Sequence, residues 1–90
     1  MSAHVVGSRF GLGVEVRVSP AVAALLPGSY GRICDIRYDA TRGELEYEVR
    51  FTPADLERFY IPAGEDRFWY RPNQLEYHSG ITGFVDDVAA

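Results

Sequence analysis

The sequence predicts an all-β domain, a small barrel of about five short antiparallel strands. Residues 45–51 alternate strictly between apolar and charged side chains, which is the period of a half-buried strand. Residues 14–18 repeat this alternation in Val-Glu-Val-Arg-Val. Asp39 and Gly43 supply turn chemistry in the middle of residues 30–51, so this stretch is predicted to be a β-hairpin.

The length of the chain sets the number of domains. A chain of 90 residues forms one domain with a single compact core. Its hydrophobic content of 47% and aromatic content of 13% are enough for a packed interior. We expect a flexible N-terminal arm over residues 1–9, the barrel over residues 10–78, and a C-terminal tail over residues 79–90.

Two short helical turns are predicted between the strands. The first strand, residues 14–18, ends before Pro20 because proline cannot donate a hydrogen bond to a sheet. Helix formers follow it, so a short helical turn is expected in loop 20–27, or else a loop that lays Leu25 and Leu26 over the end of the barrel. A second turn is expected over residues 53–58, where Thr52 is a plausible N-cap and proline occupies the first helical position.

The other strands follow from the same patterns. Residues 30–39 do not alternate strictly, which predicts a bulge near Cys34. A fourth strand is expected over residues 67–71 and a fifth over residues 75–78, joined by a tight turn. Alternation then predicts the core residues Val14, Val16, Val18, Ile33, Ile36, Leu45, Tyr47, Val49, Phe51 and Leu75.

Over roughly residues 10–78 the chain resembles the SH3-like barrel superfamily. The motifs that carry the resemblance are Gly13-Val-Glu-Val-Arg-Val18, Gly31-Arg-Ile33, Tyr47-Glu-Val-Arg-Phe51 and Gln74-Leu-Glu76. Within that superfamily it is similar to the group that includes the C-terminal domain of the nitrile hydratase β-subunit, the variable subunit of ferredoxin:thioredoxin reductase and PsaE-type subunits. KOW-type nucleic-acid modules and several phage assembly proteins share the barrel. The resemblance implies a fold and docking onto larger partners, and it implies no chemistry.

The charge of the chain bears on its partners. The formal net charge is -4, which disfavours binding to phosphate backbones and to anionic lipid. All nine basic residues are arginine. Two explanations are open: selection for bidentate contacts to carboxylate or phosphate groups, or a coding bias of the source genome. Because the arginines are spread along the chain, coding bias is the simpler interpretation.

No catalytic or metal-binding set can be assembled from the sequence. Cys34 is the only cysteine, and a lone cysteine within a strand is expected to be a small core residue. His4 and His78 lack the spacing of metal ligands. We therefore predict a protein that is not an enzyme and has no metal and no cofactor. Without a secretion signal or a membrane span, it is expected in the cytoplasm or in an intracellularly assembled particle, away from membranes.

The aromatic residues give the strongest functional signal. If Phe68 and Tyr70 point inward, Trp69 points outward with its arginine neighbours, as at the centre of a protein interface. The opposite register would place Trp69 in the core, and the rings could instead cap the ends of the barrel. The predicted partner-binding residues are Trp69, Arg67, Arg71, Tyr38, Phe59 and Tyr60.

Three functions remain open at this point. The first is a protein-docking or assembly module, such as a small subunit of a larger complex or of a phage particle. The second is a KOW-like nucleic-acid-binding module, and the third is an accessory subunit of a redox or hydratase enzyme. An acidic, aromatic-rich chain with two unpatterned termini favours the first, with a larger protein or protein assembly as partner.

Overall fold

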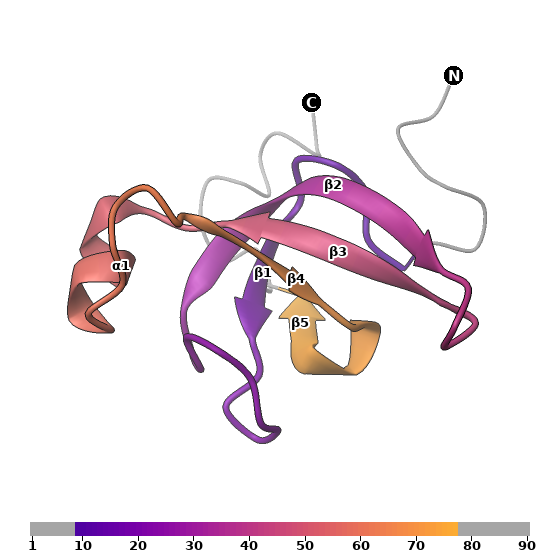
Figure 1. Ribbon diagram of the computed structural model, residues 1–90. Helices are drawn as coiled ribbons and strands as arrows, with labels where there is room; N and C mark the ends of the chain where they lie inside the picture. Colours follow the sequence, from indigo (N-terminus) through magenta and orange to yellow (C-terminus); the bar gives the residue numbers. More distant parts are fainter. Residues whose placement is uncertain (1–8, 78–90) are drawn as a thin grey trace, which may run out of the picture.

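The computed structural model describes residues 9–77, which form a five-stranded antiparallel sheet with one short helix (Figure 1). The strand order is β4-β3-β2-β1-β5, so β4 and β5 are the edges and the sheet is not closed by hydrogen bonds. The five antiparallel strands confirm the predicted β-sheet domain, but the predicted closure into a barrel is not shown. The elements are β1 (Glu15–Val18), β2 (Tyr30–Asp39), β3 (Glu44–Arg50), the helix α1 (Pro53–Arg58), β4 (Arg67–Tyr70), the 3-10 turn η1 (Pro72–Gln74) and β5 (Leu75–Tyr77).

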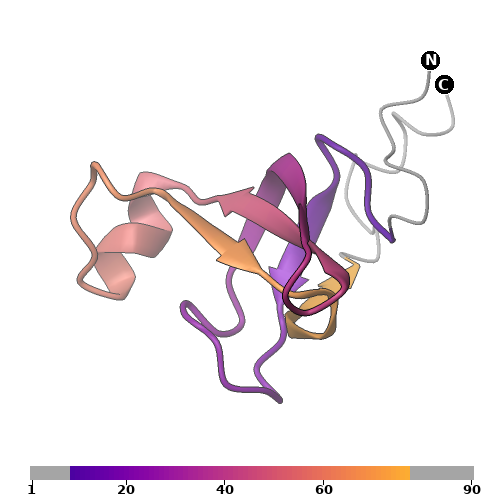
Figure 2. The same ribbon diagram turned by 45° about the vertical axis from the view of Figure 1, so that its right-hand side comes forward.

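β2 is the strand that both halves of the sheet share (Figure 2). Its first residues pair with β1, with Gly31 opposite Val16, and from Arg32 onward it pairs with β3. The register shifts by one residue between Ile33 and Asp35, which confirms the predicted bulge. The sheet is thereby divided into β5-β1-β2 and β2-β3-β4.

Gly31 allows the two halves to come close together. A Cβ atom at this position would lie 2.5 Å from Val49 Cγ1 and 2.7 Å from the Arg50 carbonyl oxygen. Both distances are shorter than real contacts permit, so a side chain here would push β2 away from β3. Glycine at position 31 therefore permits a close approach of the β2 and β3 backbones.

The core lies on the concave side of this bent sheet. Of the predicted core residues, Val14, Ile36 and Leu45 pack against its margin, while the others are buried. Alternation alone did not reveal the remaining members, because they come from loops, the helix and the inner face of β4. These additional buried residues are Phe10, Leu26, Leu56 and Tyr70.

The helical turn predicted in loop 20–27 is wrong, since this loop consists of bends and turns. Its carbonyl groups bond to distant side chains instead of to a helical ladder. The Tyr70 hydroxyl donates to the Leu25 carbonyl oxygen at 2.8 Å, and Gln74 Nε2 donates to that of Ala23 at 3.0 Å. Burial raises the pKa of Tyr70 well above its ordinary value, so its hydroxyl keeps the proton that it donates. Leu26 reaches the core with a φ of 53°.

The helix α1 confirms the second predicted turn and is capped at both ends. The backbone N–H of Asp55 donates to Thr52 Oγ1 at 3.3 Å. At the other end, Ile61 N–H donates to the Leu56 carbonyl oxygen at 2.8 Å and Tyr60 N–H to that of Glu57 at 3.1 Å. This is a Schellman motif, in which Tyr60 takes the left-handed position that usually holds glycine.

The predicted N-terminal arm and C-terminal tail lie outside the described residues, apart from Arg9. The backbone N–H of Arg9 donates to the Tyr47 hydroxyl at 2.9 Å. Among residues 9–77 the helical segments are too short to cross a membrane.

Candidate docking surface

Three arginines lie in register across the outer face of the sheet. Arg32 of β2 is directly opposite Arg50 of β3, and Arg50 is directly opposite Arg67 of β4. We call Arg32, Arg50 and Arg67 the arginine row. Glu15 of β1 continues the row beyond Arg32. Directly opposite residues have Cβ atoms about 5 Å apart, so three cations occupy neighbouring positions.

Arg50 and Arg67 share one carboxylate, that of Asp66. Asp66 Oδ2 lies 3.2 Å from Arg50 Nε, and Asp66 Oδ1 lies 3.7 Å from Arg67 Nε. Arg32 Nη1 donates to the Gly13 carbonyl oxygen at 2.9 Å. The side chains of Arg50 and Arg67 are 60% and 52% exposed, so their guanidinium groups remain accessible.

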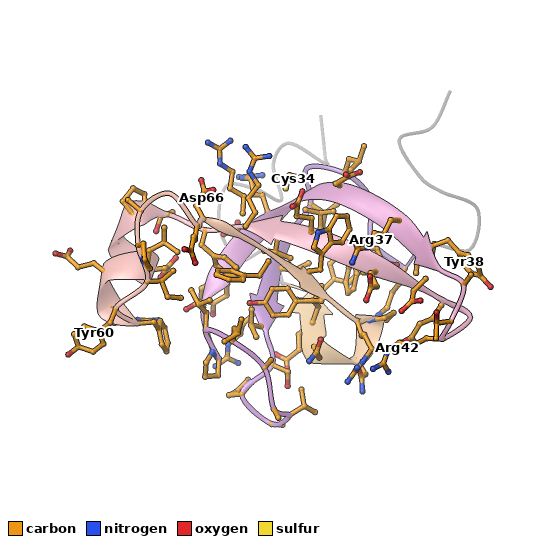
Figure 3. The ribbon with its side chains drawn as sticks, viewed as in Figure 1. Cys34, Arg37, Tyr38, Arg42, Tyr60 and Asp66 are labelled. Atoms are coloured by element: carbon orange, nitrogen blue, oxygen red, sulfur yellow. The ribbon has the colours of Figure 1, made fainter. Side chains whose placement is uncertain are left out.

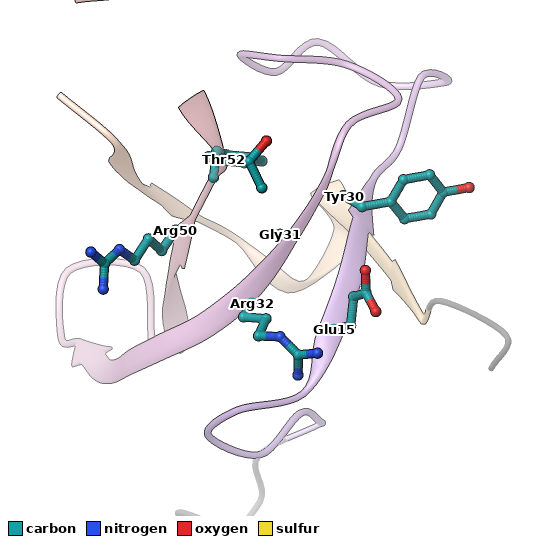
Figure 4. A pocket seen from close by; sticks show the side chains of 7 residues that line it. Glu15, Tyr30, Gly31, Arg32, Arg50 and Thr52 are labelled. Carbon is teal, nitrogen blue, oxygen red and sulfur yellow. The ribbon is translucent and has the colours of Figure 1, made fainter. Parts of the chain in front are cut away.

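A groove of about 270 Å³ lies beside the arginine row. It occurs where β3 ends and the chain turns toward α1, while β2 continues along β1. Gly31 and Phe51 contribute apolar surface, and Tyr30 is 42% exposed beside them. Its lining residues are Glu15, Tyr30, Gly31, Arg32, Arg50, Phe51 and Thr52 (Figure 4).

Trp69, the centre of the predicted site, lies on the outer face opposite Glu48 of β3 and is half-buried. The guanidinium carbon of Arg37 lies 4.0 Å from the centroid of the Trp69 ring, which is a cation–π contact. Arg37 Nε in turn donates to Glu46 Oε1 at 2.7 Å. The Trp69 ring is therefore covered by a neighbour of its own sheet and is not an open anchor.

The other predicted residues do not gather around Trp69. Tyr38, 64% exposed near the β2–β3 turn, and Tyr60, 94% exposed after α1, lie at opposite ends of the molecule (Figure 3). Phe59 is partly buried against the core. Arg71 Nε lies 3.9 Å from Glu44 Oε2, beyond the end of β4. Of the predicted set, only Arg67 belongs to the arginine row.

A second groove, of about 370 Å³, lies at the hairpin end of the sheet and includes Tyr38. One arginine and one glutamate line it, without an excess of either charge. The lining residues are Arg9, Tyr38, Gly43, Glu44, Leu45, Tyr47 and Pro72.

Cys34 is exposed, so its predicted place in the core is wrong. The bulge explains the error, because an unshifted hairpin register would place Cys34 opposite the buried Val49, where Ile33 lies instead. Although the residue is exposed, partial burial of its thiol and a hydrogen bond to Glu48 raise the pKa of Cys34. Its Sγ lies 3.5 Å from Glu48 Oε1. A thiol that stays protonated is a poor nucleophile.

The part of the chain that the structure describes holds no cluster of three or more metal-binding side chains. Arg32 and Arg50 were missed in the sequence because they lie on different strands, and Tyr30 was not assigned to the site because its neighbour Arg32 was not. Only the strand register reveals them, and this register depends on the bulge. Comparison with family models, curated proteins and solved structures finds no match for the chain. The function is therefore inferred from the arrangement of the side chains.

Proposed function

We propose that this domain is a non-catalytic protein-docking module that binds a carboxylate-containing segment of a larger protein or assembly. The arginine row and the groove beside it form the binding surface. The observation that carries the proposal is the in-register placement of Arg32, Arg50 and Arg67 on a chain whose net charge is -4.

An arginine row is unfavourable for folding alone. Like charges directly opposite each other on a sheet destabilise it. The chain contains more carboxylates than arginines, so opposite charges could have been paired at these positions instead. A row of guanidinium groups is favourable once a ligand brings carboxylates, because each planar group can hold a carboxylate through two parallel hydrogen bonds. The row is thus better suited to recognition than to stability.

The groove adds an apolar component to this surface. Gly31 and Phe51 offer apolar contact next to the Tyr30 ring. Tyrosine and arginine side chains are the residues that most often dominate binding energy at protein interfaces. The ligand class that fits is an extended segment with an apolar side chain close to a carboxylate.

The five antiparallel strands support an SH3-like arrangement for the domain, here with open sheet edges. Barrels of the group that the sequence resembles dock onto larger partners, which is consistent with a small subunit of an assembly. The accessory-subunit function is a special case of this docking. Cytoplasmic location, or a place within an intracellularly assembled particle, remains part of the proposal.

A second candidate is binding of single-stranded nucleic acid. The arginine row and the exposed Tyr30 ring favour it, since guanidinium groups bind phosphates and aromatic rings stack on bases. Carboxylates beside the row oppose it, because Asp35 and Glu48 face each other in the next row and Asp66 lies at the edge. These carboxylates repel a phosphate backbone along its path, so docking to protein is favoured.

Site-specific photo-cross-linking tests the proposal. Tyr30 is replaced by benzoylphenylalanine in the full chain, which is then irradiated in the native source. Tyr38, also an exposed tyrosine of β2, is replaced in the control protein. A discrete protein adduct from position 30, and none from position 38, is expected. An adduct with nucleic acid, or equal adducts from both positions, would contradict the proposal.

Gel shifts with single-stranded and duplex nucleic acid address the second candidate directly. Binding that depends on phosphate contacts weakens steeply as salt increases. We expect no shift at either low or high salt. A shift at low salt that disappears at high salt, and that is lost in Arg32→Gln/Arg50→Gln, would support nucleic-acid binding instead.

A further inference from the structure

The sequence contains a segment with the chemistry that the groove and the arginine row are suited to accept. Residues 84–87 read Phe-Val-Asp-Asp, two apolar residues followed by two carboxylates. We propose that this C-terminal segment of the chain occupies the docking surface of the same molecule. The inference rests on the proposed function, because it assigns a resident ligand to the same surface.

The described part of the chain ends at Tyr77, close to the groove. Tyr77 of β5 and Gly31 of β2 both pair with Val16 of β1, from opposite sides. They are therefore two strand spacings apart, about 10 Å. Residues 78–83 can span up to about 20 Å when extended. Residues 78–83 are therefore long enough to bridge this distance, so docking within one molecule needs no rearrangement of the sheet.

The spacing of the chemical groups also matches. In an extended segment Phe84 and Asp86 lie on the same side, about 7 Å apart. Phe51, only 4% exposed, lines the groove together with Gly31, Arg32 and Arg50. A ring placed in the groove thus brings the following carboxylate to the guanidinium groups.

Charge favours this contact over a contact with another part of the sheet. The next row of the outer face carries Asp35 and Glu48, which repel the segment. Two carboxylates adjoin the arginine row: Glu15 lies opposite Arg32, and Asp66 pairs with Arg50 and Arg67. The Asp66 bond to Arg50 at 3.2 Å is an exposed ion pair of the kind that contributes little to stability. An incoming carboxylate can therefore join or replace Asp66 at little cost.

A resident ligand regulates the docking surface. A short linker gives a tethered segment an effective concentration of the order of millimolar. A partner must displace this segment. The apparent affinity of the partner therefore equals its intrinsic affinity multiplied by the fraction of molecules whose docking surface is free. The surface is thereby reserved for partners whose segment binds more tightly than residues 84–87.

Paramagnetic broadening in the full chain tests the inference with the native cysteine. Cys34 is the only cysteine, is exposed, and lies two residues from Arg32 on β2. A nitroxide attached to it under mildly alkaline conditions should broaden the amide signals of residues 84–87. The signals should recover in Asp86→Asn/Asp87→Asn and in Arg50→Gln. Arg42→Gln, which removes an equal charge at the β2–β3 turn, should leave the broadening unchanged.

Three results would overturn the inference. The first is the absence of broadening at residues 84–87, and the second is broadening that survives the loss of both carboxylates. The third is broadening in a mixture of labelled unenriched protein and unlabelled 15N-enriched protein, which would place the segment on a second copy. If the segment fails these tests while cross-linking from position 30 still captures a protein, the docking function stands and only its resident ligand is lost.

Discussion

Arg32 of β2 and Arg50 of β3 lie directly opposite each other on the outer face of the sheet, and Arg67 extends the same row on β4. Two adjacent cations on neighbouring strands repel each other. The arginine row is therefore expected to lower the stability of the sheet while providing a surface for recognition.

Replacing the middle arginine should therefore stabilise the fold. Arg50→Gln removes the repulsion on both sides, and Asp66 keeps its contact with Arg67. The free energy of unfolding should rise by about 0.3 kcal/mol at low ionic strength. Urea denaturation measures this, and the gain should shrink at about 1 M salt, where charges are screened within about 3 Å. A loss above about 1 kcal/mol would show that Arg50 serves stability.

Gly31 is expected to tolerate no side chain. Gly31→Ala places a Cβ atom against Val49 and the Arg50 carbonyl oxygen, so β2 and β3 must separate. The free energy of unfolding should fall by about 1–3 kcal/mol, as in other overpacked sites. Gly64→Ala is the matched control, because no atom lies within 4 Å of its Cβ position. Equal melting temperatures for the two variants would contradict the described approach of the strands.

The Trp69 ring should contribute moderately to stability. Because Trp69 is half-buried and covered by Arg37, Trp69→Ala should cost about 1–2 kcal/mol, between the values for exposed and core aromatic residues. A double-mutant cycle with Arg37→Ala should give a coupling energy of about 0.5–1 kcal/mol. A coupling energy near zero would mean that the two side chains do not stack in solution.

Tyr60 should be replaceable with a gain in stability. Its φ of 59° lies in the left-handed region, and its side chain is 94% exposed. Tyr60→Gly should raise the free energy of unfolding by up to about 1 kcal/mol, since glycine adopts this conformation without strain. Leu26 has a similar φ of 53° but is buried. Leu26→Gly should therefore lose about 2–5 kcal/mol in the same denaturation experiment. A loss of stability in Tyr60→Gly would indicate that the ring makes contacts of its own.

Local signals explain which parts of the fold could be predicted. The hairpin and α1 depend on alternation and capping within a few residues, and both agree with the structure. Loop 20–27 depends on partners that are distant in sequence. Tyr70 and Gln74, which bond to its carbonyl groups, lie 45 and 51 residues away from them. No local pattern could indicate those bonds.

The candidate surface was harder to predict for a related reason. Alternation indicated that Trp69 could face outward, but the cover by Arg37 depends on neighbouring strands. The arginine row needs the strand register, and a shift of one residue moves side chains to the other face. The bulge at Cys34 makes that shift within β2 and brings Arg32 opposite Arg50. Arginines that are dispersed along the chain are therefore adjacent in space.

The proposed role of the arginine row is to bind a partner protein. Its most direct test is the capture of proteins from the native source on the immobilised full chain, quantified side by side for the wild type, Arg32→Gln/Arg50→Gln and Arg42→Gln. Loss of two hot-spot arginines should weaken capture of the specific partner by at least about 2 kcal/mol, roughly thirty-fold in affinity. The Arg42→Gln protein should retain it. Equal capture by all three proteins would contradict this role.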